Sequence, residues 1–469
     1  MTVTAPTRVL LIQAPLGRVE PPVVPVGLAW LAAGLPADVQ VEIVDPNVHG
    51  PDAVAARIQA LDPHLVGVSL RNIDTTQILD AYSFYAHFPP FIRQLRALVG
   101  PDVPLVVGGP GFSLFADAVM ADVPELDFGV YLEGEQTFGR LLRSLDRPQD
   151  VPGVYHRAGG ELRFTGPGPR TLLDGLRPRL DLVDVPLYRP YAKNYAIGIQ
   201  TKRGCVLACS YCTYVVLSGA SVRCRDPSQV VDEVAFYVDE HGVDQLFFAD
   251  AVFNLPPDHA RAICRALVKR QVQVRWRAYH NERTLDRDYL ALAVEAGCTE
   301  FTFSPDAWSS QSLRKLQKNI RTEDIQRSLE LVASVPGANA NYNFFLGIPG
   351  QDLGEIARIL GFYVQARRAL GTRLRGFRFG YVRVEPKTPM WEEMVAKGAL
   401  SADDPLLPRT PDASLRFFHQ STGKRATDLA CSLSQLHRWP LGRRPVAQAG
   451  DERLPMRDLA RRVLRVGNA

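Results

Sequence analysis

The sequence has no apolar run long enough to cross a membrane, and mainly apolar runs such as those at 66–70 and 246–252 have the length of strands. A membrane-spanning helix needs about 20 consecutive apolar residues, so none is expected. The first residues, Met1–Pro6, carry neither the charged start nor the apolar stretch of a secretion signal. We therefore expect a cytoplasmic protein with no membrane partner.

Neither sign of charge dominates, because 54 Lys and Arg against 50 Asp and Glu give a net charge of only +4 over 469 residues. A nucleic-acid partner is not favoured, since domains that bind nucleic acid carry a clearly basic patch. Basic residues do crowd between Arg438 and Arg465, where a solvated amphipathic helix explains them more simply than an anionic partner does. A chain of this length suggests two or three domains.

Cysteine is scarce and odd in number, with seven residues in the chain. Three of them, Cys205, Cys209 and Cys212, stand together at C-x3-C-x2-C spacing. Outside this run there is no Cys-x-x-Cys or His-x-x-His, so a four-ligand zinc site is not expected. Three thiolates on one loop suit a [4Fe–4S] cluster with one iron left open; the alternative is three structural cysteines. We expect the other cysteines to be buried structural residues: Cys224, Cys264, Cys298 and Cys431.

The spacing, with the aromatic Tyr211 just before the last cysteine, resembles the signature of the radical S-adenosylmethionine (SAM) superfamily. The resemblance implies that the open iron binds SAM and that reductive cleavage there yields a 5′-deoxyadenosyl radical. It also implies an electron donor such as a flavodoxin or ferredoxin. Cys205, Cys209 and Cys212 are then both the metal ligands and the catalytic residues.

The N-terminal third alternates predicted strands with predicted helices. The strands are expected at Arg8–Ala14, Val39–Asp45, Leu65–Leu70, Pro104–Val107 and Phe128–Leu132. The helices are expected near Val26–Gly34, Asp52–Leu61, Phe91–Val99 and Phe115–Met120. This alternation predicts an α/β fold with a parallel sheet covered on both faces, of the flavodoxin-like or Rossmann-like kind. Ligands of such sheets bind beyond the carboxyl ends of the strands.

Turn residues follow three of these strands, at 69–74, 108–111 and 133–137. Together they resemble the cobalamin (B12)-binding domain found before many radical SAM domains, with Gly108-Gly109-Pro110 and Gly134-Glu135 as its Gly-Gly-Pro turn and Gly-Glu pair. The alternative is a Rossmann-like domain with ordinary loop glycines. The residues implied to contact cobalamin are Ser69, Leu70, Arg71, Asn72, Gly108, Gly109, Pro110, Glu133, Gly134, Glu135 and Thr137.

The first predicted strand departs from the classical cobalamin domain, because Ala14–Pro22 contains no histidine to serve as the lower cobalt ligand. We therefore expect cobalamin without a histidine lower ligand. Arg71 is the side chain best placed to lie beneath the corrin, where its charge would disfavour a sixth ligand. The alternative for Arg71 is a salt bridge at a strand end.

The sequence predicts four parts: a cobalamin-binding domain at 1–137, a linker rich in Pro, Gly and Arg at 138–194, a radical SAM barrel at 195–400 and a C-terminal extension at 401–469. After a strand beginning at Tyr195, the second domain has predicted strands at Gln245–Asp250, Val272–Tyr279, Thr299–Ser304, Ala340–Leu346 and Phe377–Val384. Six strand–helix units match the partial (β/α)6 barrel that the resemblance implies, with reactive groups at the carboxyl ends of the strands.

The strand ends of this barrel carry the SAM contacts that the resemblance implies: Tyr211, Asp250, Asn254, Ser304, Asp306, Gly347 and Pro349. Asp250 and Asp306 could instead cap helices. Lys318 lies where relatives often keep a basic residue, although a solvated lysine is an equal alternative. Aromatic residues after 400, including His419, His437 and Trp439, receive no site role.

A cluster, SAM and cobalamin together imply a methyltransferase that passes a methyl group from SAM, through cobalamin, to a carbon of a small-molecule substrate of secondary metabolism. The motifs resemble those of small-molecule C-methyltransferases, including tryptophan methylases. Two alternatives remain open: a rearrangement or cyclisation without net methyl transfer, and a sensor of corrinoid or cluster without turnover.

Overall fold

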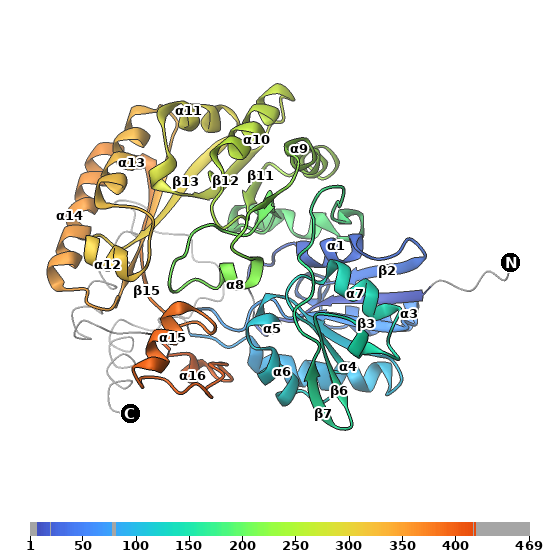
Figure 1. The fold of residues 1–469 in the computed structure, drawn as a ribbon. Coiled ribbons are helices and arrows are strands. Elements are labelled where there is room, and N and C mark those ends of the chain that lie inside the picture. The colour runs from blue at the N-terminus through green and yellow to red at the C-terminus, as the bar shows by residue number, and fades with distance from the viewer. Residues whose placement is uncertain (1–6, 19, 77–80, 416, 419–469) are drawn as a thin grey trace.

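The computed structural model describes residues 7–18, 20–76, 81–415 and 417–418 (Figure 1). Its described part contains two α/β units joined by a short irregular segment. The first unit holds a sheet with the strand order β2-β1-β3-β4-β5-β6-β7. The strands are β1 (Thr7–Gln13), β2 (Val39–Val44), β3 (Leu65–Ser69), β4 (Leu105–Gly108), β5 (Phe128–Val130), β6 (Val154–Ala158) and β7 (Glu161–Phe164).

Strands β1 to β5 are parallel and follow the order 2-1-3-4-5, which is that of flavodoxin-like sheets. The predicted flavodoxin-like fold is confirmed. The helices of this unit are α1 (Val26–Ala33), α2 (Pro46–His49), α3 (Ala53–Leu61), α4 (Phe88–Val99), α5 (Pro110–Leu114), α6 (Ala116–Asp122) and α7 (Gly134–Leu142).

Both faces of this sheet are apolar because successive residues of a strand point to opposite sides. Val9 and Leu11 of β1 pack with α1 and α7 on one face. Leu10 and Ile12 pack on the other face, where α3, α4 and α6 contribute buried side chains. The helices cover both faces of the sheet but leave the carboxyl ends of its parallel strands uncovered.

The segment 138–194 differs from the irregular linker expected there. It contains the end of α7 and the strands β6 and β7, which continue the first sheet in antiparallel pairing with β5. Gly159 and Gly160 form the two-residue turn between these strands, both with positive φ (61° and 86°). A Gly-Gly pair suits such a hairpin turn because glycine adopts positive φ without strain. Only 165–194 connects the units without a strand, by way of the 3-10 turns Leu180–Leu182, Val185–Leu187 and Arg189–Asn194.

The second unit is a parallel sheet with the order β15-β14-β13-β12-β11-β8 and helices on its outer face (Figure 1). Its strands are β8 (Gly198–Ile199), β11 (Gln245–Phe248), β12 (Arg275–His280), β13 (Cys298–Asp306), β14 (Ala340–Leu346) and β15 (Leu374–Tyr381). Its outer helices are α9 (Pro227–Ala235), α10 (Pro257–Lys269), α11 (Arg287–Glu295), α12 (Ser310–Lys315), α13 (Thr322–Ser334) and α14 (Leu353–Leu370). Six parallel strands in sequence order confirm the predicted partial (β/α)6 barrel.

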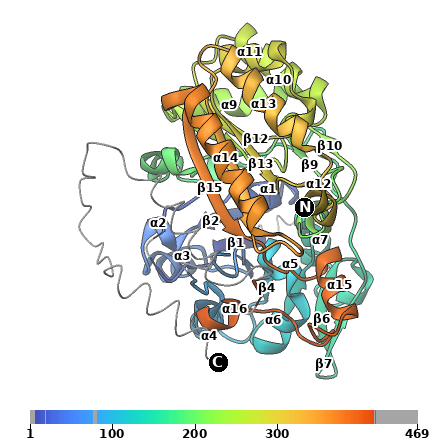
Figure 2. The same ribbon diagram turned by 90° about the vertical axis from the view of Figure 1, so that its left-hand side faces the viewer.

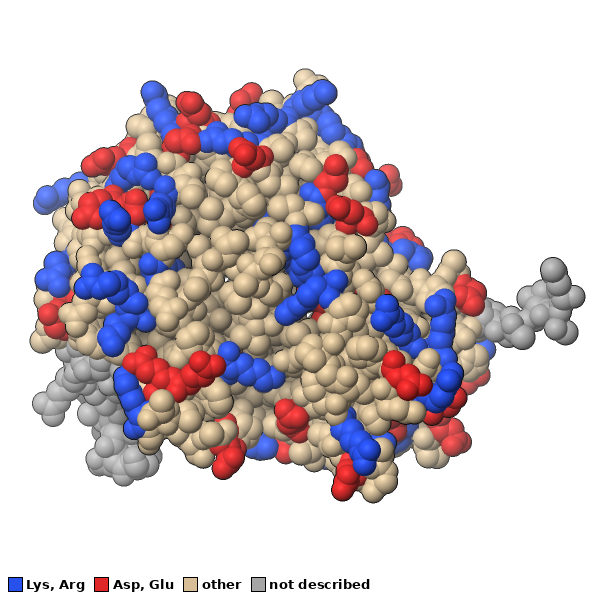
Figure 3. All heavy atoms as spheres, viewed as in Figure 1, with Lys and Arg blue, Asp and Glu red and all other residues tan. Residues whose placement is uncertain are grey.

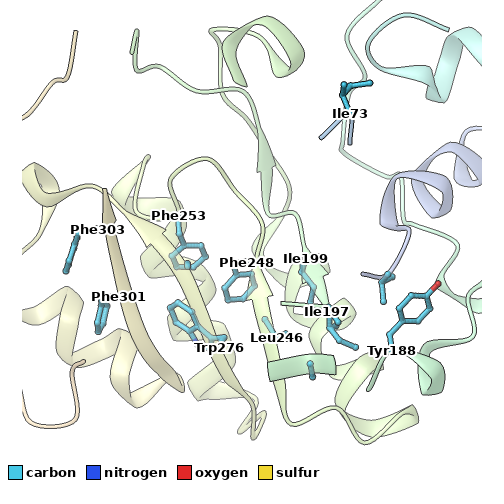
Figure 4. Close-up of a cluster of buried hydrophobic side chains, with 14 of the residues drawn as sticks. Ile73, Tyr188, Ile197, Ile199, Leu246, Phe248, Phe253, Trp276, Phe301 and Phe303 are labelled. Carbon is cyan, nitrogen blue, oxygen red and sulfur yellow. The ribbon is translucent and has the colours of Figure 1, made fainter. Parts of the chain in front are cut away.

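Aromatic side chains fill the space between this sheet and its outer helices (Figure 4). Phe248 lies 4.8 Å from Phe253 and 5.1 Å from Trp276, measured between ring centroids, and all three are buried. Phe301 and Phe303 extend the cluster along β13. This core fixes the strands whose carboxyl ends carry the candidate site.

Three short elements lie at the mouth of the barrel: β9 (Lys202–Arg203), β10 (Arg223–Cys224) and α8 (Tyr214–Ser218). After β15 the chain returns to the first unit through α15 (Pro389–Ala396) and α16 (Pro411–Leu415). There Arg409 pairs with Asp122 at the end of α6, and Ser83 donates a hydrogen bond to the carbonyl of Pro408 (2.7 Å). Figures 1 and 2 both show α16 beside the first sheet and its helices.

Most of the C-terminal extension expected at 401–469, namely 419–469 with His419, His437, Trp439 and the basic run, lies outside the described residues. Among the helices that are described, none combines the length and the apolar character needed to cross a membrane.

Candidate functional site

A cavity of about 580 Å³ lies between the carboxyl ends of the strands of the two units. The first unit contributes Ser69 at the end of β3, Gly108 at the end of β4 with Gly109 just after it, and Glu133 and Gly134 after β5. The barrel contributes residues around β8, β9 and β11: Tyr195, Gly198, Gln200, Arg203, Phe247 and Ala249. The face shown in Figure 3 carries charges of both signs, and Lys and Arg side chains gather at its centre, where the two units meet. Two sets of strand ends thus face one shared, partly open cavity.

The turn after β4 comes unusually close to the turn after β3. Gly109 has a φ of +99°, and a Cβ placed on it would lie 2.8 Å from the carbonyl oxygen of Leu70. A Cβ on Gly111 would also lie 2.8 Å from that oxygen, which accepts the amide of Gly111 (3.0 Å). Glycine is therefore required at both positions, and backbone rather than side chains forms this wall of the cavity.

Arg71 projects into the cavity from the turn after β3. Its side chain is exposed to the cavity space, and no hydrogen bond or ion pair to it exists within the described ranges. Burial lowers the pKa of its guanidinium, an effect that the charge of Asp45 opposes. The alternative of a salt bridge at the strand end is thus not what the structure shows. No histidine lines the cavity in the part of the chain that is described.

Glu133 and Glu135 join the two units by hydrogen bonds to arginines. Glu133 accepts from Arg223 (2.8 and 2.5 Å), from Arg203 (3.3 Å) and from the amide of Thr171 (2.8 Å). Glu135 accepts from Arg203 (2.6 Å). Burial opposes ionisation of Glu133, but these donors outweigh it and hold its pKa at about 2. Both carboxylates already form hydrogen bonds within the protein, so the turn after β5 would contact a ligand chiefly through its backbone.

Eight of the residues predicted to contact cobalamin line the cavity: Ser69, Arg71, Gly108, Gly109, Pro110, Glu133, Gly134 and Glu135. Leu70, Asn72 and Thr137 do not line it. Leu70 is buried and serves through its backbone carbonyl, while the hydroxyl of the buried Thr137 donates to the carbonyl of Pro152 (3.2 Å).

The three cysteines lie on the loop between β9 and α8, and all three are partly buried. Gly204, which has a φ of +90°, starts the loop, and a Cβ on it would lie 1.9 Å from the carbonyl of Ser221. Ser210 anchors the middle: its amide donates to Leu316 (3.0 Å) and its carbonyl accepts from Met390 (2.8 Å). The loop is thereby held against both α12 and α15.

The thiols are close enough to influence one another's ionisation. The pKa of Cys212 is raised to about 11, chiefly by burial and to a smaller extent by the neighbouring Cys209 and Cys205, whereas the amide of Tyr214 and the charge of Lys318 lower it. The amide of Tyr214 donates to the sulfur of Cys212 (3.4 Å). Within the described residues, no three His, Cys, Asp or Glu side chains converge as they would around a single metal ion. A cluster distributes its cysteine ligands over several irons, so this donor set fits a [4Fe–4S] cluster better than a lone ion.

Tyr211, Asp306 and Lys318 form a buried group beside the cysteine loop. Lys318 donates to Asp306 (2.7 Å) and to the carbonyl of Ser304 (2.8 Å), and the hydroxyl of Tyr211 donates to the same carboxylate. The ring of Tyr211 also packs edge-on against Phe345, 5.1 Å between centroids. Lys318 is therefore not the solvated lysine weighed as an alternative.

The other predicted SAM contacts are committed to contacts within the protein. Asp250 accepts from Lys202 (2.8 Å) and from the amide of Thr201 (2.9 Å), which ties β11 to β9. Asn254 donates to the carbonyl of Asn281 (2.9 Å) and accepts that residue's amide (2.8 Å). The alternative of Asp250 and Asp306 as helix caps does not describe either residue, because both form buried ion pairs.

The remaining predicted SAM contacts, Ser304, Gly347 and Pro349, lie within β13 and just after β14. The hydroxyl of Ser304 accepts from Asn343 (3.1 Å). The amide of Gly347 donates to Gln351 (3.0 Å), and Gln351 donates to the carbonyl of Phe345 (3.1 Å), which closes the turn that contains Pro349.

Arg203, Arg223 and Arg170 were not predicted as site residues, although they surround Glu133. Isolated arginines in segments rich in turn residues form no recognisable motif. Their partner, Glu133, also lies far away in the sequence, in the first unit. Tyr195 and Phe247 of the cavity wall were likewise not predicted, because an aromatic residue in or next to a strand looks like a core residue in a sequence.

Two family models match the chain: the B12 binding domain at residues 12–142 and the Radical SAM superfamily at residues 199–363. An uncharacterized methyltransferase of Pyrococcus horikoshii is 24% identical over 390 residues, which are 80% of this chain and 79% of that relative. An anaerobic magnesium-protoporphyrin IX monomethyl ester cyclase of Synechocystis sp. is 26% identical over 238 residues, which are 50% of this chain and 48% of the cyclase.

Among solved structures, the radical SAM methyltransferase TsrM of Kitasatospora setae, with tryptophan substrate and a SAM analogue bound, has a TM-score of 0.75. It is 21% identical, and the match covers 90% of this chain and 88% of that chain. The likeness shows a shared fold over both units. With its B12-binding domain followed by a radical SAM domain, the chain belongs to the cobalamin-dependent radical SAM enzymes, whose cofactors are cobalamin, SAM and a [4Fe–4S] cluster.

Proposed function

We propose that this enzyme transfers a methyl group from SAM to a carbon of a small-molecule substrate. The observation that supports the proposal most directly is the 580 Å³ cavity, whose walls come from the carboxyl ends of both sets of strands. A cavity of this size is in the range of pockets that bind small molecules. When bound, the cofactors supply methyl transfer and radical formation, while the chain positions them and the substrate.

The cysteine loop would hold the cluster, and the glycine-lined turn after β4 would let a corrin approach the backbone closely. Arg71 would place a positive charge on the same side as that turn. Because a guanidinium cannot coordinate cobalt, it would keep a protein ligand away from the metal. Ser69 and the backbone around Gly134 would complete the polar contacts to the corrin.

The barrel side of the cavity favours a flat, partly apolar substrate. Tyr195 lies edge-on to Phe247, 5.0 Å between centroids, and Phe247 lies edge-on to Tyr279 at 5.9 Å. Tyr279, which packs on Phe247 but does not line the cavity itself, remains 40% exposed. Arg277 stacks over Tyr195 at 4.6 Å and so fixes that ring. The related methyltransferase with bound tryptophan agrees with a substrate of this shape.

The experiment that tests the proposal uses SAM labelled in its methyl group, with reconstituted enzyme, a chemical reductant and a panel of small aromatic metabolites. We expect the label in a carbon-methylated product, together with S-adenosylhomocysteine. Turnover of a substrate with no label in the product would contradict methyl transfer.

A second candidate function is a ring closure or rearrangement without net methyl transfer. The relative that favours it is the anaerobic cyclase, which matches half of this chain. The same experiment separates the two, because a cyclase would change the substrate and form 5′-deoxyadenosine without incorporating label.

A further inference from the structure

The segment that follows β15 contacts the first unit at two places beside the cavity. We call residues 383–390 the bridging segment. Arg383 forms an ion pair with Asp74 in the turn after β3 (2.5 Å), and both side chains are buried. The Lys387 ammonium donates to the carbonyl of Ser113 in α5 (3.0 Å). The bridging segment is thereby fixed to the turn after β3 and to the helix that follows β4.

Ser113 is part of the cavity wall and ties two of its turns together. Its hydroxyl donates to the carbonyl of Gly109 in the turn after β4 (3.0 Å). The same hydroxyl accepts the amide of Leu132 in the turn after β5 (2.8 Å). Lys387 therefore holds the residue on which both of these turns converge.

The other end of the bridging segment lies against the cysteine loop. The amide of Met390 donates to the carbonyl of Ser210, which stands between Cys209 and Cys212 (2.8 Å). Only two residues separate Met390 from Lys387 in the chain. Three residue steps span at most about 11 Å between Cα atoms, so one short stretch connects the cavity wall to the cysteine loop.

The bridging segment is constrained between these two contacts. The hydroxyl of the buried Thr388 donates to the carbonyl of Glu385 (2.6 Å) and accepts the amide of Trp391 (3.3 Å), which caps α15. Pro389 occupies the first position of α15, where its fixed φ suits the helix. Lys387 has a φ of 62°, a left-handed conformation that persists in lysine only where surrounding contacts hold it. A segment constrained in this way keeps its two contacts at one separation.

The partners of Lys387 are neutral. No ion pair to its ammonium exists in the part of the chain that the structure describes. Besides the Ser113 carbonyl, the ammonium donates to the hydroxyl of Tyr131 (3.3 Å) and lies 4.9 Å from the centre of that ring. A carbonyl, a hydroxyl and an aromatic face therefore fix the position of this side chain by their geometry rather than by charge pairing.

We propose that Lys387 is a positioning residue: through the bridging segment it fixes the turns of the first unit relative to the cysteine loop, and hence the cobalt relative to the cluster. The proposal rests on the assignment of the corrin to the turns after β3 and β4 and of the cluster to the cysteine loop. It goes beyond the proposed methyl transfer, since a cyclase would need the same alignment. Misplacing reacting groups by about 1 Å can cost about a hundredfold in rate.

The test compares four forms of the full chain, each reconstituted with cluster and cobalamin: wild type, Lys387→Met, Lys387→Arg and the control Lys269→Met. Lys269 is exposed at the end of the outer helix α10. Iron and cobalt are counted first. The electron paramagnetic resonance signal of cobalt(II) is then recorded with the cluster oxidised and with it reduced, because only the reduced cluster carries an unpaired spin. The splitting of this signal depends steeply on the separation of the two spins.

We expect all four forms to bind iron and cobalt equally. Lys387→Met keeps the length of the side chain but cannot donate, so the two units are no longer held at one separation. The splitting should therefore spread to at least twice its wild-type width. Lys387→Arg keeps a cationic donor and should restore most of the wild-type signal, and Lys269→Met should match wild type. A wild-type signal in Lys387→Met, or equal broadening in Lys269→Met, would overturn the positioning role.

Tyr131→Phe provides a second variant, which removes one acceptor of Lys387 and keeps the ring. Its splitting should broaden less than that of Lys387→Met, and a larger effect would contradict the leading role of the lysine. Partial loss of cobalt does not obscure either result, because only chains that carry both metals show the splitting. If wild type binds iron but no cobalt, the corrin assignment and the positioning role both fail. If the splitting behaves as expected but no substrate is methylated, only the proposed methyl transfer fails.

Discussion

Lys318 and Asp306 form a buried ion pair, 2.7 Å between Nζ and Oδ2, directly beside the loop of the three cysteines. Asp306 has a φ of 65°, a left-handed conformation that asparagine tolerates at least as well as aspartate. Asp306→Asn therefore removes the charge with little change of backbone strain. It leaves the Lys318 ammonium buried without a counter-ion, a situation that typically costs about 3–5 kcal/mol.

We expect Asp306→Asn to lower the free energy of unfolding by that amount, measured by urea denaturation of the metal-free protein at pH 8. Asp258→Asn, at an exposed position on α10, is the matched control and should change stability by less than about 0.5 kcal/mol. A loss of less than about 1 kcal/mol for Asp306→Asn would mean that the pair is not buried as described.

Because of Glu133, the stability of the contact between the two units should fall at acid pH. Its pKa is about 2 in the folded chain against an ordinary 4.5, so its ionised form stabilises the fold above pH 4.5. That stabilisation is lost as the pH falls from about 4.5 toward 2. We expect Glu133→Gln to unfold at lower temperature than wild type at pH 7, and the gap to narrow below pH 4.5. A gap that stays constant from pH 7 to pH 3 would contradict the arginine contacts.

Glu282 should make the stability of the fold depend on pH in the opposite sense. Burial raises its pKa to about 7, although Lys318 opposes the shift, and its Oε1 atom has no hydrogen-bond partner. Between about pH 4.5 and 7 the unfolded state loses this proton more readily than the folded state, so stability falls as the pH rises. Glu282→Gln cannot ionise. We expect it to be about 1–3 kcal/mol more stable than wild type at pH 8 and equal to it near pH 4.5, measured by urea denaturation. Equal stability at both pH values would contradict a buried, unpaired carboxyl group.

Gly109→Val should block the corrin without unfolding the chain. A side chain there would meet the carbonyl of Leu70 at 2.8 Å and would have to push the turn into the cavity. We expect cobalt retained after gel filtration to fall at least tenfold, while the cysteine loop still loads iron. Gly361→Ala on α14, where a Cβ meets nothing within 4 Å, is the control and should retain cobalt fully. Full cobalt retention by Gly109→Val would remove this turn from the cobalamin site.

The sequence predicts both sheets well, because apolar strands alternate with helices throughout and parallel strands bring their carboxyl ends to one edge. That reasoning places Ser69, Gly109 and Gly134 on one cavity although they are far apart in the chain. The β6–β7 hairpin was missed because Gly159-Gly160 stands in a segment dense in turn residues, where a two-residue hairpin turn is hard to distinguish from a loop.

Side-chain roles within the site are harder to predict than its location. Asp250 at a strand end can contact a cofactor or anchor a neighbouring strand, and only the packed structure shows Lys202 beside it. The contact of Glu133 with Arg203 and Arg223 joins different units, so no local pattern indicates it. Such ion pairs depend on how the two units pack against each other. The spacing of residues along one sequence does not show that packing.

The most direct test of the whole account is a Mössbauer measurement on anaerobically reconstituted, iron-57-loaded protein incubated with cobalamin. The account predicts about four irons per chain in a [4Fe–4S] signal, with about one cobalt per chain co-purifying, and loss of the cluster signal alone in Cys209→Ala. A chain that binds no cubane cluster under these conditions, or a Cys209→Ala variant that keeps the full signal, would contradict it.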